Sequence, residues 1–348
     1  MDLDLFGMMR KEGHEALHVF SDPESGLRAI IGIHSTKLGP ALGGCRMWPY
    51  RVTEEAVQDV LHLSKAMTYK AAVADLSLGG GKAVVIGDST KDKTEALLVA
   101  LGRCVESLNG KYLIAEDVGM TLQDMESIHR GTSHVAGRAR EKGGSGDPSI
   151  MTALGVLEGM KVCLEEVFGD PSLKDRVVAI QGVGKVGTHL TQLLHGEGAR
   201  LYLSDLDSER LRKIPGSLKA TITSPEEIYS VPCDLFAPCA LGGVINEQTL
   251  QLLRCRIIAG AANNQLADKQ YGSRLYERGI LYAPDYVINA GGLINIACEF
   301  SGYSPDRALA RVRGIADTLR KVFTLSKREG IPSYQASDQM AQDRLKLS

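Results

Sequence analysis

Lys82 has the residue type and the surroundings of a group that could exchange protons. It follows three consecutive glycines, 79–81, and precedes an apolar, β-branched run, 83–86. Glycines let the backbone approach a ligand closely, and the apolar run is typical of a buried strand. A lysine held against apolar structure is partly desolvated, which can lower its pKa from about 10.4 toward about 7 to 8. We therefore expect Lys82, where a glycine loop becomes a strand, to be a catalytic base.

Lys70 offers a second positive charge. It ends a helical segment that the sequence predicts over 53–68, with Thr53 as the N-cap. If Lys70 lies near Lys82, it disfavours a second positive charge there and can bind a carboxylate. The alternative is that both are ordinary surface lysines.

Asp117 is the candidate acid–base partner of Lys82. It follows a strand expected over 112–115 and precedes Gly119. Working groups of open α/β sheets lie at such carboxyl ends of strands. The alternative is that Asp117 caps the helix that follows.

The second half of the chain carries the pattern of a dinucleotide-binding fold. A strand is expected over 176–181, followed by Gly-x-Gly-x-x-Gly at 182–187, a helix over 188–196 and a second strand ending at Asp205. The glycines would allow a tight turn, close pyrophosphate approach and helix packing, and the helix N-terminus would face the phosphates. Asp205, with Asp207 nearby, would accept from a ribose hydroxyl and repel a 2′-phosphate, so NAD is favoured over NADP.

Three loops are expected to line the cofactor crevice. They follow strands predicted at 233–238, 256–260 and 280–282. Their uncharged hydrogen-bonding groups are those of Asn263, Asn264 and Asn289, although any one of these could equally be a turn residue. A tight loop is also expected at 39–47, where Gly43 and Gly44 could offer backbone N–H groups to an anion.

Length and composition predict an α/β protein of two domains. The 348 residues are 44% apolar and 24% charged, as in a soluble globular protein, and the net charge of −2 argues against nucleic-acid binding. Residues 1–6 show no signal or transit pattern, and no apolar run is long enough to span a membrane, so a cytoplasmic location is expected. The seven cysteines form no Cys-x-x-Cys pair and the histidines no ligand spacing, so we expect reduced thiols and no metal.

A glycine-rich hinge at 142–149 sets the expected domain boundary. Residues 1–142 would form an N-terminal α/β domain, for which the family resemblance given below implies substrate binding and oligomerisation. Residues 143–327 would form a Rossmann NAD-binding domain, with a cleft between the two. A long helix over 306–327 would return the chain, so that 328–348 joins the first domain.

These motifs together resemble the amino-acid dehydrogenase family that includes glutamate, leucine, valine and phenylalanine dehydrogenases. The resemblance covers nearly the whole chain, and the motifs are similar to those of the leucine and phenylalanine branch. The segments that carry it are 39–47, 67–70, 78–82, 115–119, 261–266 and 282–292.

The resemblance implies NAD-dependent, reversible oxidative deamination of an L-amino acid to a 2-oxo acid and ammonia. Lys70 would hold the substrate carboxylate, Lys82 would be catalytic and Asp117 would move protons. Substrate-binding residues would be Leu42, Gly43, Gly44, Met67, Lys70, Ala115, Asn263, Asn264, Leu293 and Ile296. Cofactor-binding residues would be Asp147, Thr152, Gly182, Val183, Gly184, Lys185, Val186, Gly187, Asp205, Ala240, Asn263 and Asn289. A homo-oligomer, often an octamer, is also implied.

The substrate is expected to be leucine or another branched-chain amino acid. Glutamate-specific members carry a lysine where this chain has Leu42, and an apolar residue there would leave a γ-carboxylate unpaired. Ala115 and Asn295 are similar to the leucine enzymes, whereas Leu293 and the segment 143–147 are similar to the phenylalanine and tryptophan enzymes. Aromatic amino acids are thus the alternative, and dual activity is compatible with pockets that differ by a methylene. An inactive NAD-binding sensor and a 2-hydroxy-acid dehydrogenase are the more distant alternatives.

Overall fold

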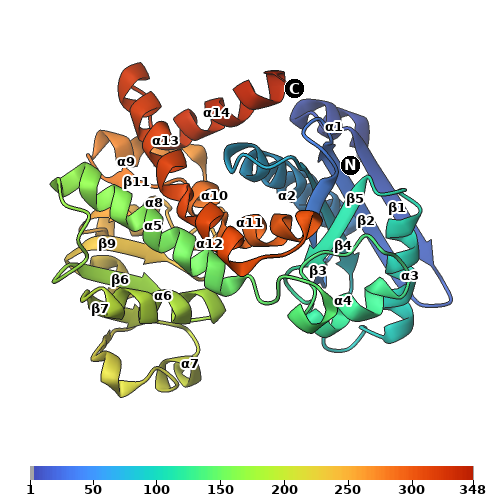
Figure 1. The fold of residues 1–348 in the computed structure, drawn as a ribbon, viewed down its shortest axis with the longest axis horizontal. Helices are drawn as coiled ribbons and strands as arrows, with labels where there is room; N and C mark the ends of the chain where they lie inside the picture. The colour runs from blue at the N-terminus through green and yellow to red at the C-terminus, as the bar shows by residue number, and fades with distance from the viewer. Residues whose placement is uncertain (1–3, 348) are drawn as a thin grey trace. The chain divides into compact units, whose positions relative to one another are not determined.

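The computed structural model describes residues 4–347, so residues 1–3 of the acidic N-terminal stretch lie outside the description. The chain forms two compact units, coloured from blue to red along the sequence in Figure 1. Unit 1 consists of the residues up to Asp147, Ile296–Ser304 and the residues from Ala341 onward, whereas unit 2 consists of Pro148–Asn295 and Pro305–Met340. This division differs from the expected one because 296–304 belongs to unit 1 and 328–340 to unit 2.

Unit 1 is built on a five-stranded mixed sheet in the order β1-β2-β4-β3-β5. Its strands are β1 (Ala16–Asp22), β2 (Leu27–Ser35), β3 (Ala41–Trp48), β4 (Gly79–Ile86) and β5 (Tyr112–Glu116). β1 and β2 run antiparallel, as do β2 and β4, whereas β3 pairs in parallel with β4 and β5. The central strand β4 carries Lys82, which lies opposite Gly32 of β2.

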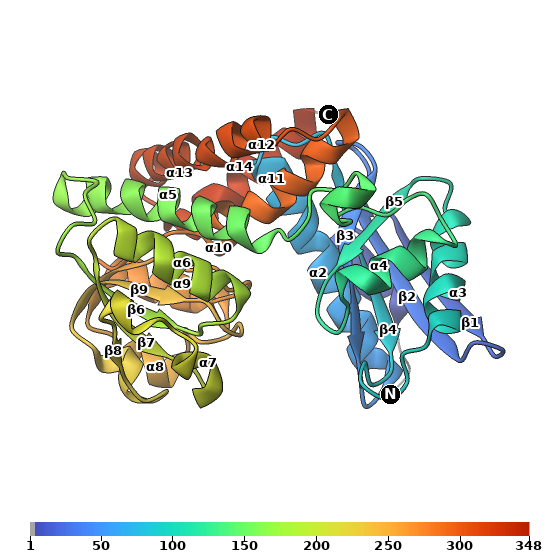
Figure 2. The same cartoon turned by 60° about the horizontal axis from the view of Figure 1, so that its bottom comes forward.

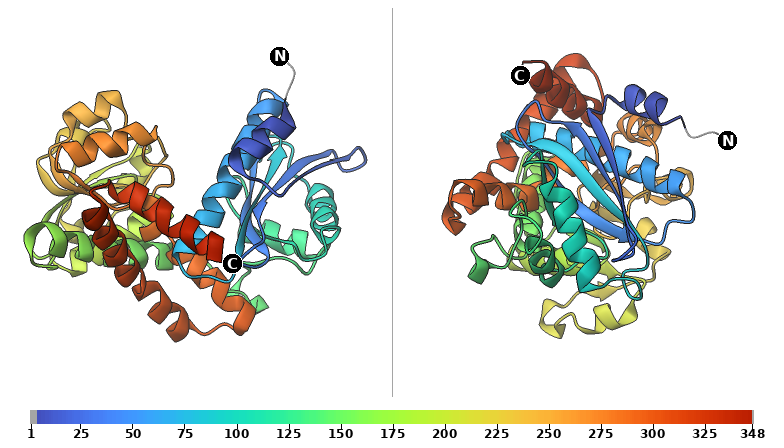
Figure 3. Two further views of the ribbon diagram at one scale, coloured as in Figure 1. Left: turned by 90° about the horizontal axis from the view of Figure 1, so that it is seen from above. Right: turned by 90° about the vertical axis from the view of Figure 1, so that its right-hand side faces the viewer.

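Helices cover both faces of this sheet, as the views in Figure 2 and Figure 3 show. On one face, α3 (Glu95–Glu106) and α4 (Leu122–His129) pack on the large core that contains Ile31, Val85 and Met125. On the other face, α1 (Leu5–Glu12) and α2 (Thr53–Val73) pack on Ile30 and Val84. Neighbouring residues thus point to opposite faces, as the pleat of a strand requires.

Two glycine-rich segments that were expected to be loops are strands. Residues 41–48 form β3 between β4 and β5, and the three glycines 79–81 lie within β4 rather than before it. The reason is the close approach of neighbouring backbone. A Cβ on Gly43 would lie 1.7 Å from the carbonyl oxygen of Gly81, and one on Gly80 would lie 2.1 Å from the backbone nitrogen of Thr68.

Helix α2 also differs from the expectation. It begins at Thr53 itself, its N-cap is Val52, and no side chain caps it. It continues to Val73 instead of ending at 68, so Lys70 lies in its last turn. The last carbonyl groups of a helix have no hydrogen-bond donor within it. At the end of α2 the Arg344 guanidinium provides donors, to the carbonyl oxygens of Ala72 at 2.8 Å and Leu76 at 3.1 Å.

Unit 2 is built on a six-stranded parallel sheet in the order β11-β10-β9-β6-β7-β8. The strands are β6 (Val177–Gln181), β7 (Arg200–Ser204), β8 (Thr221–Ile222), β9 (Cys233–Pro238), β10 (Cys255–Ile258) and β11 (Leu281–Tyr282). When the strands are numbered within the unit, their order is that of a Rossmann fold. The chain adds β7 and β8 on one side of β6 and then β9, β10 and β11 on the other side, so the order of the strands, not their direction, reverses between β6 and β9. Ligands of such folds bind at that point, outside the carboxyl ends of the strands.

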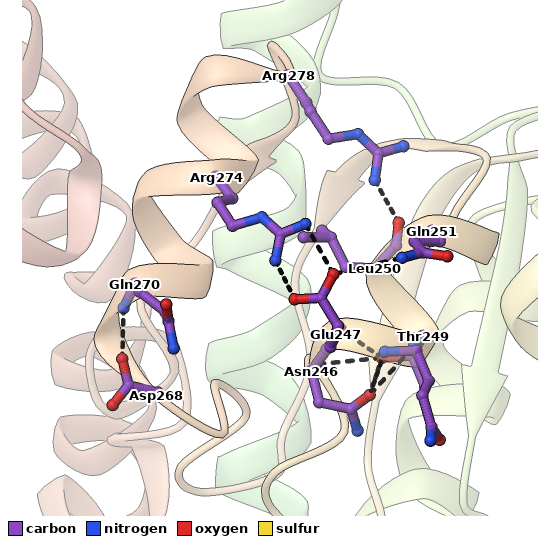
Figure 4. Close-up of polar contacts among 10 residues, drawn as sticks. Asn246, Glu247, Thr249, Leu250, Gln251, Asp268, Gln270, Arg274 and Arg278 are labelled. Carbon is purple, nitrogen blue, oxygen red and sulfur yellow. Dashed lines mark hydrogen bonds and ion pairs between the residues drawn. The ribbon is translucent and has the colours of Figure 1, made fainter.

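The helices of unit 2 include α5 (Ser149–Phe168), α6 (Lys185–Gly196), α7 (Ser208–Arg212), α8 (Glu247–Leu252), α9 (Lys269–Glu277), α10 (Asp285–Ile288) and α11 (Gly291–Ala297, of which the last two residues belong to unit 1). Figure 4 shows the polar contacts at α8 and α9: Asn246 caps α8, Asp268 caps α9, and the ion pair between Arg274 and Glu247 joins the two helices. The single helix expected over 306–327 is two helices, α12 (Pro305–Arg313) and α13 (Ile315–Glu329), separated by Gly314. The last helix, α14, spans Ser333–Leu347.

Within residues 4–347, no helix is long and apolar enough to cross a membrane. The seven cysteines form no disulfide, and the same part of the chain holds no group of three metal-ligating side chains.

Candidate active site

The structure brings Lys82 and Asp117 into contact. Lys82 is 5% exposed in the middle of β4, and its Nζ donates to Oδ2 of Asp117, the residue after β5. The strand β3 lies between β4 and β5. Both side chains therefore reach across one strand to meet, which is a geometry that neither residue's sequence surroundings specify.

The surroundings of Asp117 keep it charged. Burial by itself would raise the pKa of this carboxyl, but the positive charges of Lys82 and Arg46 and the hydrogen bond from Lys82 outweigh it, so the pKa lies below its usual value of 3.8. Arg46 Nε lies 3.6 Å from the same oxygen, Oδ2. A carboxylate and an ammonium group thus contact each other in a partly buried site, and the Arg46 guanidinium adds a second positive charge next to the carboxylate.

The substrate-side residues predicted on β3 and β5 are buried side chains of the same sheet. Leu42 is 1% and Ala115 4% exposed, and Ala115 pairs with Gly44 in the register of β3 and β5. A Cβ on Gly44 would lie 2.6 Å from Cβ of Asp117. The second glycine of the pair therefore leaves room for the aspartate, and it does so from within a strand rather than from the anion-binding loop that was expected.

Met67 and Lys70 both lie on α2, and both are partly buried. This helix packs on β4 at Gly80, where Thr68 makes the close approach. The contact between α2 and β4 thus lies two positions before Lys70 in one element and two positions before Lys82 in the other. That Lys70 holds a carboxylate beside Lys82 stays a prediction.

The glycine-rich loop of unit 2 follows β6 and has three differently constrained glycines. Gly182 has a φ of +100°, and a Cβ on it would lie 2.6 Å from Cβ of Ala240. A Cβ on Gly187 would lie 2.1 Å from the carbonyl oxygen of Gly182, whereas above Gly184 only the tip of Arg210 comes within 4 Å. The turn, the helix packing and the open approach for a pyrophosphate are thus separate requirements, each met by one glycine.

Helix α6 begins directly behind this loop. It starts at Lys185, three residues before the expected start, and includes Val186 and Gly187 in its first turn. No side chain caps its N-terminus. Backbone N–H groups at such an end, together with the helix dipole, favour an anion.

Asp205 directly follows β7 and contacts the glycine loop. Its side chain is 7% exposed and accepts hydrogen bonds from the backbone N–H groups of Val183 at 2.8 Å and Asp207 at 2.9 Å. Arg210 lies 3.8 Å from Oδ2. The carboxylate therefore shapes the glycine loop as well as presenting negative charge at its edge.

The predicted asparagines have different positions. Asn264 has a φ of +52° and its carbonyl accepts from Gly243 N–H at 2.8 Å, so it serves as a turn residue. Asn289, which caps α10, donates from Nδ2 to Asn263 Oδ1 at 2.8 Å and to the Ala261 carbonyl at 3.1 Å.

Asn289 also fits the group that a dinucleotide fold implies. Its Oδ1 is buried and has no hydrogen-bond partner within residues 4–347, although buried polar atoms are nearly always paired. A hydroxyl or amide donor of a bound dinucleotide would satisfy it. Together with the open space above Gly184, this atom indicates that the residues present fit a dinucleotide.

The remaining predicted residues lie in or next to two helices, α5 and α11, and they are Asp147, Thr152, Leu293 and Ile296. Thr152, in the first turn of α5, donates to the Pro148 carbonyl at 3.0 Å, and α11 approaches it through Gly292, where a Cβ would lie 2.7 Å from the Thr152 hydroxyl. Leu293 is 8% exposed on α11. Asp147 and Ile296 belong to unit 1.

Sequence reasoning gave no role to Arg46 or Glu299. Arg46 lies inside the segment that was expected to be a loop, and its only signal was membership of that motif. Glu299 accepts from the backbone N–H groups of Gly137 at 3.1 Å and Ser145 at 2.6 Å. It ties the returning segment 296–304 to unit 1, and no local pattern marks it.

The Rossmann sheet with its glycine loop and the buried lysine–aspartate pair define a dinucleotide-dependent dehydrogenase. Family comparison refines this class. Residues 14–134 match the model described as "Glu/Leu/Phe/Val dehydrogenase, dimerisation domain", and residues 143–209 and 203–324 match "Glutamate/Leucine/Phenylalanine/Valine dehydrogenase". The chain belongs to the Glu/Leu/Phe/Val dehydrogenase family.

Three relatives illustrate the similarity. The leucine dehydrogenase of Thermoactinomyces intermedius is 52% identical over 345 residues, covering 99% of this chain and 94% of the relative. The phenylalanine dehydrogenase of the same organism is 46% identical over 345 residues with the same coverage. Among solved structures, L-tryptophan dehydrogenase from Nostoc punctiforme matches with a TM-score of 0.83 at 42% identity, covering 98% of both chains.

Proposed function

We propose that this protein catalyses the NAD-dependent, reversible oxidative deamination of branched-chain L-amino acids, leucine foremost, to 2-oxo acids and ammonia. The observation that carries the proposal is the contact between Lys82 and Asp117, in a sheet whose predicted substrate-side residues Leu42 and Ala115 are buried and apolar. The greater identity to the leucine than to the phenylalanine dehydrogenase of one organism favours the aliphatic substrate.

The pair can transfer protons to and from the oxygen and nitrogen atoms attached to the substrate's Cα. A bound dinucleotide would supply the hydride acceptor. Lys82 would take the proton that water loses as it adds to the iminium carbon, and Asp117 would carry a proton from the carbinolamine hydroxyl to the leaving nitrogen. Lys70 would hold the α-carboxylate as an ion pair. In sum, one amino acid, one water and one oxidised dinucleotide would give one 2-oxo acid, one ammonium ion, one reduced dinucleotide and one proton.

Leucine, valine, phenylalanine, tryptophan and glutamate as substrates, with NAD, test the proposal. Turnover of leucine above all the others supports it. Faster turnover of phenylalanine or tryptophan would instead assign the aromatic alternative, for which Leu293 is the candidate determinant. NAD binding without turnover of any amino acid would place the chain among inactive sensors. A reverse reaction that proceeds without ammonia would contradict deamination.

We also propose that unit 1 mediates a homo-oligomer, because the family model that matches 14–134 is described as a dimerisation domain. Light scattering on the purified chain measures the assembly mass directly. A mass of eight chains would support the octamer that the family resemblance implies, and a monomer would contradict any oligomer.

Replacing Asp205 by asparagine is expected to weaken the preference for NAD. The change removes the negative charge that would repel a 2′-phosphate and frees the side of Arg210 that lies 3.8 Å from Asp205, while Arg210 keeps its ion pair with Asp207 at 3.4 Å. We expect the ratio of kcat/KM for NAD to that for NADP to fall at least about tenfold. Steady-state kinetics with both dinucleotides measure this ratio.

The matched control is Asp268→Asn, which alters another aspartate of unit 2 that caps a helix. Its ratio should equal that of the unchanged protein. An unchanged ratio in Asp205→Asn would show that the discrimination lies elsewhere.

Replacing Ala115 by glycine is expected to shift preference toward aromatic substrates. Ala115 is 4% exposed beside Gly44, so its methyl group takes up space next to Asp117 that a ring would need. We expect kcat/KM for phenylalanine relative to leucine to rise about tenfold. Ala29→Gly, a buried position of β2 in the same sheet, controls for loss of stability. Equal ratios in the two variants would remove Ala115 from the determinants of specificity.

A further inference from the structure

A chain of polar contacts extends from the lysine–aspartate pair to the surface of α2. Asp117 Oδ2, which Lys82 contacts, lies 3.6 Å from Arg46 Nε. The other side of the Arg46 guanidinium donates from Nη1 to both carboxylate oxygens of Asp59, at 3.0 and 3.3 Å. The Tyr50 hydroxyl donates to Asp59 at 2.5 Å. Arg46 thus stands between two carboxylates, with Asp59 fixed from behind.

The two sides of the guanidinium are unequal. The side toward Asp59 makes full hydrogen bonds, whereas Nε is buried and has no hydrogen-bond partner within residues 4–347. A buried donor without an acceptor is costly. A shift of the Asp117 carboxylate toward Arg46 by a few tenths of an ångström would bring Oδ2, now 3.6 Å from Nε, within hydrogen-bond distance of it. The orphaned donor therefore marks a second position for the carboxylate.

We propose that Arg46 is a positioning residue that receives the Asp117 carboxylate when it leaves Lys82 during turnover and returns it to the same place. The proposal rests on the function proposed above, because Asp117 must move relative to Lys82 only if it carries protons. Arg46 keeps its positive charge throughout and acts through Asp117. Asp59 and Tyr50 hold the guanidinium at the distance from which it can serve both positions.

The competing explanation is that Arg46 only joins β3 to α2. In that case its loss lowers stability and leaves kcat intact. If instead Arg46 acts through Asp117, its loss lowers kcat, because the carboxylate is misplaced in the chemical step, and leaves KM for the amino acid nearly unchanged. It also has no further effect once Asp117 has been replaced, because residues that act as a unit are not additive.

The test compares Arg46→Gln, Arg46→Lys, Asp117→Asn and the double variant Arg46→Gln with Asp117→Asn, using the full-length oligomer, leucine and NAD. We expect Arg46→Gln to lower kcat at least about tenfold, with KM changed less than about threefold. Arg46→Lys should lie between it and the unchanged protein, since lysine keeps the charge but not the two-sided fork. The double variant should be no slower than Asp117→Asn.

Arg138→Gln is the matched control, because Arg138 makes a similarly buried two-point pair with Glu126 of α4 in the same unit. It should lose stability but keep kcat. An Arg46→Gln enzyme that resembles this control, or a double variant slower than Asp117→Asn by the full Arg46 effect, would overturn the proposal. If Arg46→Gln does not fold, unchanged kcat in Arg46→Lys would overturn it. Lack of turnover by the unchanged protein would instead refute the proposed function itself, and the positioning role with it.

Discussion

Replacing Lys82 by alanine is expected to lower kcat by about 10³-fold, the size of effect typical for loss of a group that transfers protons. The change removes an ammonium group that contacts Asp117 directly. It also leaves the partly buried Asp117 carboxylate without this partner, which lowers stability. Turnover and thermal unfolding must therefore be measured together, with NAD binding as evidence that unit 2 is intact.

The chain contains its own control for this experiment. Lys93 and Asp124 form a second buried lysine–aspartate pair in unit 1, at 2.7 Å, with side chains 18% and 12% exposed. Lys93→Ala should lose comparable stability and keep kcat within a few-fold of the unchanged protein. If the two lysine variants lose the same activity, loss of folding rather than of chemistry explains both, and Lys82 is not the base.

Asp117→Asn is expected to lower kcat by about 10²- to 10³-fold, because asparagine keeps the shape of the side chain but cannot accept and return a proton. It should also alter how stability depends on pH. The pKa of Asp117 lies below 3.8 in the folded chain, so the charged pair stabilises the fold above that pH and is lost as the pH falls through the lower folded value. Acid unfolding followed by circular dichroism should therefore show a weaker pH dependence in the variant.

Asp124→Asn is the counterpart in the second pair, and its kcat should remain close to that of the unchanged protein. Activity of Asp117→Asn within a few-fold of normal would leave proton transfer to another group and would remove the basis of the proposed mechanism.

The residues of the candidate site could be predicted from the sequence more readily than the elements that carry them. Lys82 and Asp117 stand beside strongly apolar runs, so their placement at strands was visible locally. The rarity of glycine in strands predicts loops at Gly43 and Gly80. The carbonyl of Gly81 and the backbone of Thr68, which exclude a Cβ at these two positions, come close only in the folded sheet.

Other features depend on partners that are distant in sequence. The parallel sheet of unit 2 and its glycine loop followed from periodicity and spacing, and the strand order agrees with that prediction. Asn289 bonded to Asn263, by contrast, depends on how two loops meet. The sequence predicts a loop at Arg46, and a loop does not fix the direction of its side chains. In a strand, successive side chains point to opposite faces of the sheet, and only this alternation determines which residues Arg46 contacts.

The bonds from Arg344 to the end of α2 have a consequence for biosynthesis. Leu76 and Arg344 are 268 positions apart, and Glu299 reaches back 162 positions to Gly137. A ribosome therefore releases the whole sheet of unit 1, and then nearly all of unit 2, before the residues that complete the first unit emerge. Contacts of such sequence separation form slowly. We infer that the nascent chain carries an unfinished first unit through most of its translation, and that the helix bearing Lys70 acquires its final hydrogen bonds among the last events of folding.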